Sequence, residues 1–256
     1  MTETYMEKKM LNLNPINKNR VCNFTHVLDS FYLWTDPGDK YVGEACREYG
    51  YWEPDLTQWM ISNIKPGSKC LDIGFNIGYY TEVLSRIVGT EGEVWAFEPN
   101  VELVDNYYKA RELNDYSNCS PITVFPFGLS NKSETVNLMG PLENIGGAGI
   151  TDSIEAPDGY FTKTIEVKRL DEVLDKDFDF IKIDVEGHEP SAWEGFSTGA
   201  LNCPLIVAEL GPYHPEEFLR GLEEIYTMET LNYVNINTDL IKAHPHHLNI
   251  VLKKRN

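Results

Sequence analysis

The sequence has no long hydrophobic run. Its apolar stretches are short, such as the one at residues 205–208, and fall far below the roughly 20 residues that a membrane span needs. The N-terminus also has no basic segment followed by an apolar one, so no secretory signal is visible. These two absences argue against a transmembrane or exported protein and favour a cytoplasmic one.

Positive charge is scarce. The chain has 22 Lys and Arg residues against 40 Asp and Glu residues, which gives a formal net charge of −18. Nucleic-acid binding depends largely on basic side chains that neutralise phosphates, so this balance argues against a nucleic-acid or anionic-membrane partner. The one short basic cluster, residues 253–255, is interpreted as a solvated tail.

The cysteines show no pairing pattern. There are five, an odd number, and no two are spaced as C-x-x-C. This is typical of reduced cytosolic thiols and not of a disulfide framework. Cys70 and Cys203 lie at the edges of apolar segments, and we expect both to pack in the core.

The sequence does contain a regular alternation of strand and helix patterns over most of its 256 residues. Strand-like segments separated by helical ones indicate βαβ units and a parallel sheet. The predicted strands are 69–73, 93–97, 122–125, 178–185 and 205–210, followed by a closing antiparallel pair at 231–236 and 248–253. The predicted helices are 55–64, 77–88, 101–113, 190–196 and 215–226.

The alternation breaks between residues 130 and 174. Two strand-like pieces, 134–139 and 164–168, flank a glycine-rich loop at 143–150, which predicts an inserted β-hairpin with a mobile tip. The overall prediction is an α/β fold with a doubly wound, mostly parallel, seven-stranded Rossmann-like sheet and an antiparallel final strand. Residues 51–256 form this domain, and the irregular, aromatic residues 1–50 form an N-terminal extension.

A polar, glycine-rich turn follows the first strand. The segment LDIGFNIGYYT places Asp72, Gly74, Asn76 and Gly78 between that strand and its helix. Glycine allows close approach of a ligand to the backbone, and ligands of such sheets bind beyond the carboxyl ends of the strands. Glu98 ends the second strand, 20 residues beyond Gly78, a spacing at which a carboxylate binds a ribose diol.

The turn favours a nucleoside without phosphates. It reads G-x-x-x-G where a dinucleotide site reads G-x-G-x-x-G, and Asp72 would oppose a pyrophosphate at the helix N-terminus. A ligand with a ribose and a cationic end fits better, and S-adenosylmethionine has an adenosine, a sulfonium and an ammonium. The alternative is a glycine-rich turn that binds nothing.

A second polar group follows the fourth strand. The run FDFIKIDVEGHEP contains Asp184, Glu186, His188 and Glu189 in quick succession. Charged residues are rarely buried unless they are paired, so this density at a strand end indicates a site, to which we assign Asp184 and His188. Glu186 and Glu189 can instead begin the next helix, where negative charge complements the dipole; for Glu189 we favour that interpretation.

These segments together resemble the FkbM family of S-adenosylmethionine-dependent methyltransferases, which have the class I Rossmann-like fold. The turn LDIGFNIGYYT is followed, in the family order, by AFEPN, VKRLDEVL, FIKIDVEGHE and IVAEL. The resemblance covers about residues 51–210 and includes Glu53-Pro54 ahead of the first helix. Phe75 departs from it, because a small residue such as alanine is commoner there, and we expect this to alter packing.

The resemblance implies a set of cofactor residues. The methionine part is surrounded by Asp72, Gly74, Asn76, Gly78 and Thr81, and Glu53 and Asp184 are counted with them. Glu98 is implied to hold the ribose, with Pro99 and Asn100 shaping that wall. Many class I methyltransferases recognise adenine with an acid after the third strand, but PITVFPFGLSN has none. Phe127 and Ser130 are therefore assigned to the adenine.

The implied reaction is transfer of a methyl group to a hydroxyl of a sugar, glycan or natural product. Such a displacement requires in-line alignment, and a base helps by roughly 10²–10⁴-fold. The candidate catalytic residues are Asp184, His188 and Glu209. Asp184, Glu209 and His214 could alternatively hold a divalent metal that acidifies the hydroxyl, which we do not favour.

Other interpretations stay open at this stage. The acceptor could be a peptide or another macromolecule, with nucleic acid disfavoured by the charge, or the chain could bind an adenosine ligand without catalysis. The late histidines His244, His246 and His247 are interpreted as a solvated loop. The aromatic residues 31–52 either cap the cofactor and provide a wall for the acceptor or only pack against the sheet. The oligomeric state is not predicted.

Overall fold

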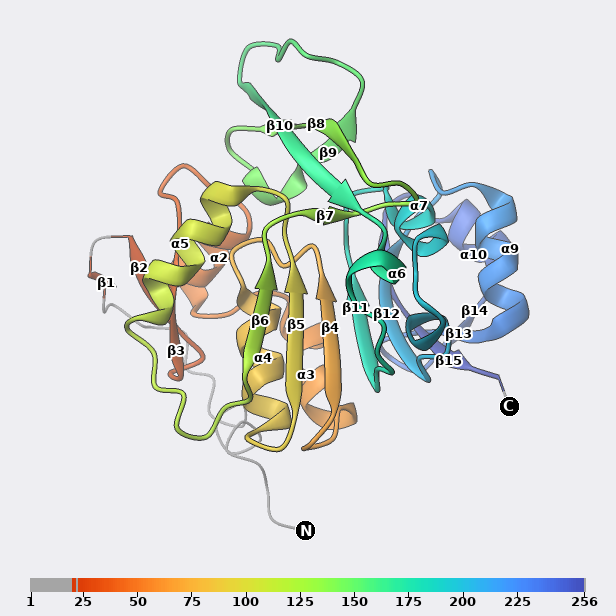
Figure 1. Ribbon diagram of the computed structural model, residues 1–256, viewed down its shortest axis with the longest axis horizontal. Coiled ribbons are helices and arrows are strands. Elements are labelled where there is room, and N and C mark those ends of the chain that lie inside the picture. Colours follow the sequence, from red (N-terminus) through yellow and green to blue (C-terminus); the bar gives the residue numbers. More distant parts are fainter. Residues whose placement is uncertain (1–19, 22, 256) are drawn as a thin grey trace.

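The structure is a computed structural model that describes residues 20–21 and 23–255, so Cys22 lies outside the described residues. A central eight-stranded sheet has the order β14-β13-β15-β12-β11-β4-β5-β6 (Figure 1). Its strands are β4 (Lys69–Ile73), β5 (Glu93–Phe97), β6 (Ile122–Phe125), β11 (Phe180–Ile183), β12 (Leu205–Leu210), β13 (Tyr226–Thr230), β14 (Asn235–Ile236) and β15 (Leu248–Lys254).

Most of this sheet is parallel, as predicted. The neighbours β12, β11, β4, β5 and β6 pair in parallel, while β15 is antiparallel to both β12 and β13. The strand beyond the predicted seven is β13, which begins where a helix was predicted, and of the predicted strand 231–236 only β14 is present. The predicted partner of β15 was wrong: it is β13, and not residues 231–236. Tyr226 and Met228 are 0% and 3% exposed, and burial of every second residue is typical of a strand. The strand therefore begins at Tyr226, and the preceding helix ends at Ile225.

Helices cover both faces of the sheet, which confirms the doubly wound arrangement (Figure 1). Along β4, Cys70 packs with one helical group and Leu71 with the other, because successive strand residues point to opposite faces. The first group is α2 (Val42–Tyr49), α3 (Pro54–Asn63), α4 (Tyr79–Val88) and α5 (Val101–Arg111). The second is α6 (Leu170–Val173), α7 (Glu189–Glu194), α8 (Thr198–Leu201), α9 (Glu216–Ile225) and α10 (Thr238–Ala243).

The N-terminal extension is more regular than the sequence suggested. It contains β1 (Arg20–Val21), β2 (Phe24–Val27), β3 (Phe31–Trp34) and helix α2, and the three strands form an antiparallel sheet. Val27, Phe31 and Leu33 are 0–1% exposed and belong to the same core as α3 and α4. The alternating pattern of apolar residues from 27 to 33 is therefore a half-buried hairpin and not an irregular segment.

The predicted insertion is present as a second sheet of four strands, in the order β7-β10-β8-β9. Its elements are β7 (Gly128–Leu129), β8 (Glu134–Pro141), the 3₁₀ helix η1 (Ile145–Gly147), β9 (Gly149–Thr151) and β10 (Tyr160–Lys168). β8 and β10 form the expected antiparallel hairpin. The glycine-rich loop 143–150 is not its tip, however, because it folds back as η1 and β9.

The strand order creates a switch point in the sheet. From β4 the chain moves outward through β5 and β6, passes through the insertion, and returns to β11 on the other side of β4. Ligands of doubly wound sheets bind in the crevice at such a point, beyond the carboxyl ends of the strands. The inserted sheet rises above these ends (Figure 1).

Among the described residues, no helix has the length and apolar character needed to cross a bilayer. Cys46, Cys70, Cys119 and Cys203 are free thiols, and Cys70 and Cys203 are 0% and 1% exposed. The expected core packing of these two cysteines is confirmed, and burial raises the pKa of both thiols.

Candidate active site

One large cavity opens at the switch point. It encloses about 1220 Å³ of empty space, including space open to solvent, between the ends of β4, β5, β11 and β12 and the inserted sheet. The residues that line it come from these strand ends, from the insertion and from the N-terminal extension.

The turn after β4 forms one end of the cavity. Gly74 has φ +82°, and a Cβ there would lie 1.9 Å from the backbone oxygen of Asp184, so glycine alone brings this turn against the end of β11. Asn76 lines the cavity with a left-handed backbone at φ +55°. Its Oδ1 is buried and lacks a hydrogen-bond partner among the described residues, which leaves an acceptor available to a ligand.

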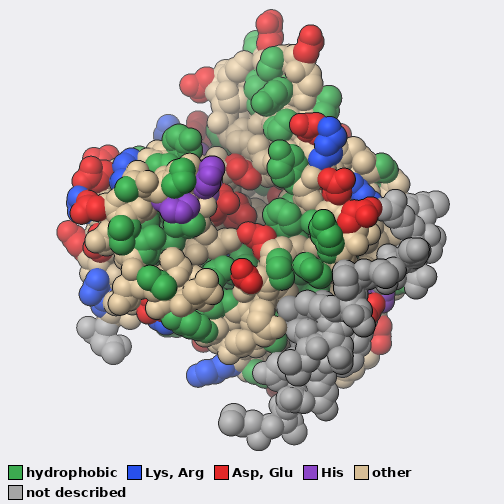
Figure 2. Space-filling model, turned by 180° about the vertical axis from the view of Figure 1, so that it is seen from behind, with side chains coloured by type: hydrophobic (Ala, Val, Ile, Leu, Met, Phe, Trp, Pro, Cys, Tyr) green, Lys and Arg blue, Asp and Glu red, His purple; other side chains and the backbone are tan. Residues whose placement is uncertain are grey.

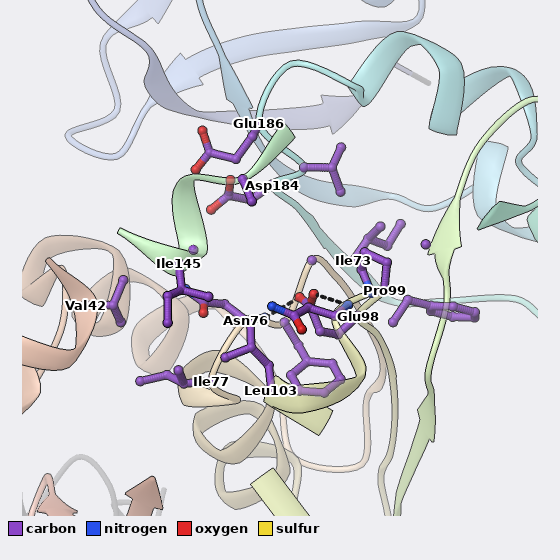
Figure 3. A pocket seen from close by; sticks show the side chains of 18 of the residues that line it. Val42, Ile73, Asn76, Ile77, Glu98, Pro99, Leu103, Ile145, Asp184 and Glu186 are labelled. Atoms are coloured by element: carbon purple, nitrogen blue, oxygen red, sulfur yellow. Dashed lines mark hydrogen bonds between the residues drawn. The ribbon is translucent and has the colours of Figure 1, made fainter. Parts of the chain in front are cut away.

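Glu98 lies beside this turn, held by backbone groups (Figure 3). Its Oε2 accepts a hydrogen bond from the Asn76 N–H and its Oε1 accepts one from the Asn100 N–H, both at 2.9 Å. The residue is 6% exposed and lines the cavity. Burial raises the pKa of its carboxyl to about 7, although both hydrogen bonds favour the ionised form. The carboxylate is thus fixed in position and has lone pairs to offer to hydroxyl groups.

Several predicted cofactor residues lie behind the cavity wall. Asp72 is 0% exposed and faces α4, where the Thr81 hydroxyl donates to its Oδ2 at 2.6 Å. The residues that line the cavity include Gly128 and Leu129. They do not include the predicted Asp72, Gly78, Thr81, Phe127 and Ser130. The cofactor roles of these five residues stay predictions.

Three carboxylates gather on the other side of the cavity, and we call them the carboxylate trio: Asp184 after β11, Glu186 beyond it and Glu209 on β12. Each offers an oxygen atom, and the three atoms lie within 4.8 Å of one another. Burial and the neighbouring Asp184 raise the pKa of Glu186 to about 7 and that of Glu209 to about 9. Figure 2 shows acidic side chains gathered at a hollow in this face, and Figure 3 shows Asp184 and Glu186 across from Glu98.

Lys182 is the basic partner of the trio. It lies opposite Asp72 in the β4–β11 pairing, and its ammonium is 3.1 Å from Asp184 Oδ2 and 5.0 Å from the centre of the Tyr80 ring. Its pKa is raised because the attraction of Asp184, Asp72 and Glu53 outweighs desolvation. Lys182 therefore stays charged and compensates part of the acidic wall.

Three histidines lie at the site or beside it. The predicted solvated loop is wrong for His247, whose Nδ1 lies 3.2 Å from Glu209 Oε2. His188 lines the cavity, its Nε2 lies 2.9 Å from Ser130 Oγ, and burial lowers its pKa. His214 is 2% exposed and its Nε2 lies 2.8 Å from Glu189 Oε2. His214 thus bonds to Glu189 and does not join Asp184 and Glu209, with which the sequence grouped it; Glu186 completes that set instead.

The insertion and the N-terminal extension together form a roof over the cavity. Asn144, Ile145 and Gly146 line it from the insertion, and Tyr41 and Val42 line it from the extension. The two parts are joined, because the backbone N–H of Lys40 donates to the Glu143 carbonyl and the two side chains form an ion pair. The Ile145 side chain lies beside Val42 and Asn76 (Figure 3).

Unusual backbone conformations concentrate at this cavity. Six described non-glycine residues have positive φ, and three of them, Glu53, Asn76 and Glu186, line the cavity. Such conformations cost on the order of 1–3 kcal/mol each and persist where the surrounding structure imposes them, often at functional sites. The placement of these polar groups is therefore enforced by the fold.

The sequence left some parts of the site open and missed others. Glu186 was open between the site and the start of the next helix, and that helix begins only at Glu189. The aromatic residues 31–52 were open between a cap and simple packing, and Tyr41 lines the cavity. Lys182 was given no role, although a lysine inside a buried parallel strand needs a partner. The contribution of residues 143–146 was missed, since nothing in the sequence pattern relates them to residues 40–42.

Comparison with known proteins agrees with this geometry. The Methyltransferase FkbM domain matches residues 72–236, more than half of the chain. The chain belongs to the FkbM methyltransferase family. It is an S-adenosylmethionine-dependent methyltransferase.

Individual relatives are distant from this FkbM chain. Hexuronic acid methyltransferase AglP of Haloferax volcanii is 25% identical over 194 residues, which are 74% of this chain and 75% of AglP. Methyltransferase FkbM from Methylobacillus flagellatus KT is 19% identical with a TM-score of 0.45 over 73% of this chain, but only 43% of that one. Fibrillarin from Aeropyrum pernix, solved with S-adenosyl-L-methionine, is 12% identical with a TM-score of 0.42, over 77% and 73%.

The cavity of this FkbM domain fits S-adenosylmethionine. Glu98 presents a fixed carboxylate where a ribose diol can bind, and Asn76 Oδ1 is a buried acceptor without a partner. Among the residues that line the cavity, Lys182 is the one Lys or Arg side chain, and it is paired with Asp184. The groups that line the cavity therefore suit a cationic nucleoside without phosphates.

Proposed function

We propose that this enzyme methylates a hydroxyl group of a sugar, glycan or natural product. The observation that carries the proposal is the carboxylate trio, which faces the nucleoside-binding end across one cavity. Carboxylates accept hydrogen bonds from hydroxyl groups and can take their proton. The name of the relative AglP, a hexuronic acid methyltransferase, also supports a sugar acceptor.

The cofactor end is proposed to work through fixed hydrogen-bond acceptors. Glu98 binds the ribose hydroxyls, Pro99 and Asn100 shape that wall, and Gly74 and Asn76 lie against the methionine part. The backbone at Gly128 and Leu129, between the predicted Phe127 and Ser130, faces the adenine. When bound, S-adenosylmethionine supplies a methyl group on a positively charged sulfur.

In the proposed mechanism Glu209 is the base. The acceptor oxygen would form the new bond to the methyl carbon as the bond from that carbon to sulfur breaks and S-adenosylhomocysteine leaves, and the acceptor proton would pass to the Glu209 carboxylate. Asp184, held by Lys182, orients the hydroxyl for in-line attack, and His188 contacts the acceptor from the Ser130 side. The raised pKa of Glu209 makes its ionised form a stronger base than an ordinary carboxylate.

A divalent cation is the second candidate for activating the hydroxyl. The trio offers three oxygen ligands of the type that Mg²⁺ and Ca²⁺ prefer. We favour proton transfer without a metal, because the Lys182 ammonium already lies on Asp184. Dialysis against a chelator should leave methyl transfer unchanged, and loss of activity that Mg²⁺ restores would favour the cation.

The direct test follows labelled methyl transfer from S-adenosylmethionine to a panel of sugars, glycans and peptides. Glu209→Gln should lower turnover by at least about 100-fold, as expected for the loss of a base, with cofactor affinity unchanged within about threefold. Glu229→Gln, which removes an acid that pairs with Lys253 in the sheet, is the matched control. Transfer to peptides alone would contradict the proposal.

We also propose that the described part of the N-terminal extension, residues 23–50, caps the site and contributes an acceptor wall. Tyr41, the residue before α2, is 50% exposed and lines the cavity, whereas Tyr49 at the end of that helix is 55% exposed and does not line it. Tyr41→Ala should raise the acceptor KM at least about threefold without changing stability, and Tyr49→Ala should not. Equal KM values for both variants would contradict a cap.

A further inference from the structure

The cavity offers a ligand many negative groups and little positive charge. Five carboxyl side chains line it: Glu53, Glu98, Asp184, Glu186 and Glu209. The one lysine or arginine among its lining residues, Lys182, has a side chain that is 4% exposed and lies 3.1 Å from Asp184. An anionic group on the acceptor would therefore find no unpaired lysine or arginine among the described residues that line the cavity. The other basic side chain there is His188, whose pKa is lowered by burial.

The carboxylate trio also favours ligands that donate hydrogen bonds. The oxygens of carboxyl groups accept hydrogen bonds, and the trio brings three such groups together, each with an oxygen within 4.8 Å of the others. A sugar hydroxyl donates a hydrogen bond, whereas a carboxylate has none to donate. A carboxylate at this place would add a fourth acid to three that already lie against one another, and this crowding of negative charge lowers its affinity near neutral pH.

A second, apolar wall comes from the insertion. Leu138, Ile150, Ile165 and Val167 line the cavity from β8, β9 and β10, and Ile145 lines it from η1. A pyranose ring has an edge of hydroxyl groups and a face of C–H groups. The acidic and apolar walls match these two surfaces.

We propose that the acceptor end of this cavity selects an uncharged sugar and rejects a uronic acid whose carboxylate faces Asp184, Glu186 and Glu209. This inference rests on the proposed function. It deepens that function by naming the charge of the acceptor at the trio and the residues that select it.

The test compares two probes that differ only at one carbon, methyl β-D-glucopyranoside and methyl β-D-glucopyranosiduronate. Binding to the protein loaded with S-adenosylhomocysteine is measured by saturation-transfer NMR at pH 7.5, in the presence of a chelator. We expect the neutral glycoside to bind at least about tenfold more tightly, because one unit charge about 4 Å from another outweighs that factor even at an effective dielectric constant near 20.

Variants assign the selection to the trio. Glu186→Gln combined with Glu209→Gln should reduce the preference at least about threefold, and Glu229→Gln should leave it unchanged. The inference is overturned if the uronide binds as tightly as the neutral glycoside or more tightly. It is also overturned if the uronide binds once Mg²⁺ replaces the chelator, or if the neutral glycoside does not bind. S-adenosylhomocysteine titration is the separate readout for the enzyme class, because its failure would contradict the cofactor site and not the acceptor preference.

Discussion

Replacing Glu98 by glutamine should weaken S-adenosylhomocysteine binding by roughly 10- to 150-fold. Each carboxylate oxygen of Glu98 now accepts one backbone N–H, from Asn76 and Asn100. A glutamine has a single carbonyl oxygen, so its amide nitrogen would face one of these N–H groups. Hydrogen bonds to charged groups contribute about 1.5–3 kcal/mol, and each 1.4 kcal/mol is a factor of ten in affinity.

The same substitution should change the pH dependence of binding. The pKa of Glu98 is about 7 because of its burial, and ribose hydroxyls donate to the ionised form. Wild-type affinity should therefore rise about tenfold from pH 6 to pH 8, as the ionised fraction grows. In Glu98→Gln the part of this pH dependence that comes from Glu98 should disappear. Any part that comes from Glu186, whose pKa is also about 7, should remain in both proteins.

The assay is isothermal titration calorimetry at pH 6, 7 and 8. Glu102→Gln is the matched control, because Glu102 is near Glu98 in sequence but its side chain is 72% exposed and pairs with Lys163. Glu98→Gln binding within twofold of wild type at pH 8, or an unchanged pH slope, would refute the assignment of Glu98 to the ribose.

Three further perturbations test other parts of the structure. Thr81→Val should lower the free energy of unfolding by about 1–3 kcal/mol in urea titrations, because buried Asp72 loses a hydrogen bond; an unchanged midpoint would contradict this. Glu189→Ala should lower the free energy of unfolding by more, about 2–5 kcal/mol, since buried His214 and a backbone N–H both lose their acceptor. A loss below 1 kcal/mol would show that these two hydrogen bonds are not needed for stability. The pKa of Glu209 is raised to about 9 on folding, so its contribution to stability is present at low pH and is lost as pH rises through 9, while the rate of methyl transfer rises over the same range. Glu209→Gln should flatten both profiles, and a wild-type rate that falls above pH 7 would exclude Glu209 as the base.

The parts of the fold that could be predicted are those encoded by local periodicity and turn chemistry. The parallel strands, the helices on both faces and the hairpin β8–β10 follow from patterns of period 2 and 3.6. The boundary at Ile225 could not be predicted from helical spacing alone, because β13 is specified by its pairing with β15. The two-residue β14 is likewise defined only by its partner.

Some residues of the candidate site could also be placed from the sequence, and others could not. Glu98 and Asp184 could be placed because strand ends of a parallel sheet meet at one edge, and both line the cavity. The cofactor role of Asp72 stays a prediction, because its Oδ2 accepts from Thr81 of α4 while its buried Oδ1 has no partner among the described residues. The role of Glu186 stayed open in the sequence because its position depends on a left-handed backbone at φ +53°, which a sequence pattern does not reveal.

The position of β15 has a consequence for how the protein is made. Residues 248–254 are the last strand along the chain, yet they lie between β12 and β13 and join them. During synthesis the open side of β12 stays without a partner until these residues leave the ribosome, and exposed strand edges of this kind promote aggregation. A truncation before residue 248 should therefore yield insoluble protein, whereas a tag placed after residue 255 should be tolerated.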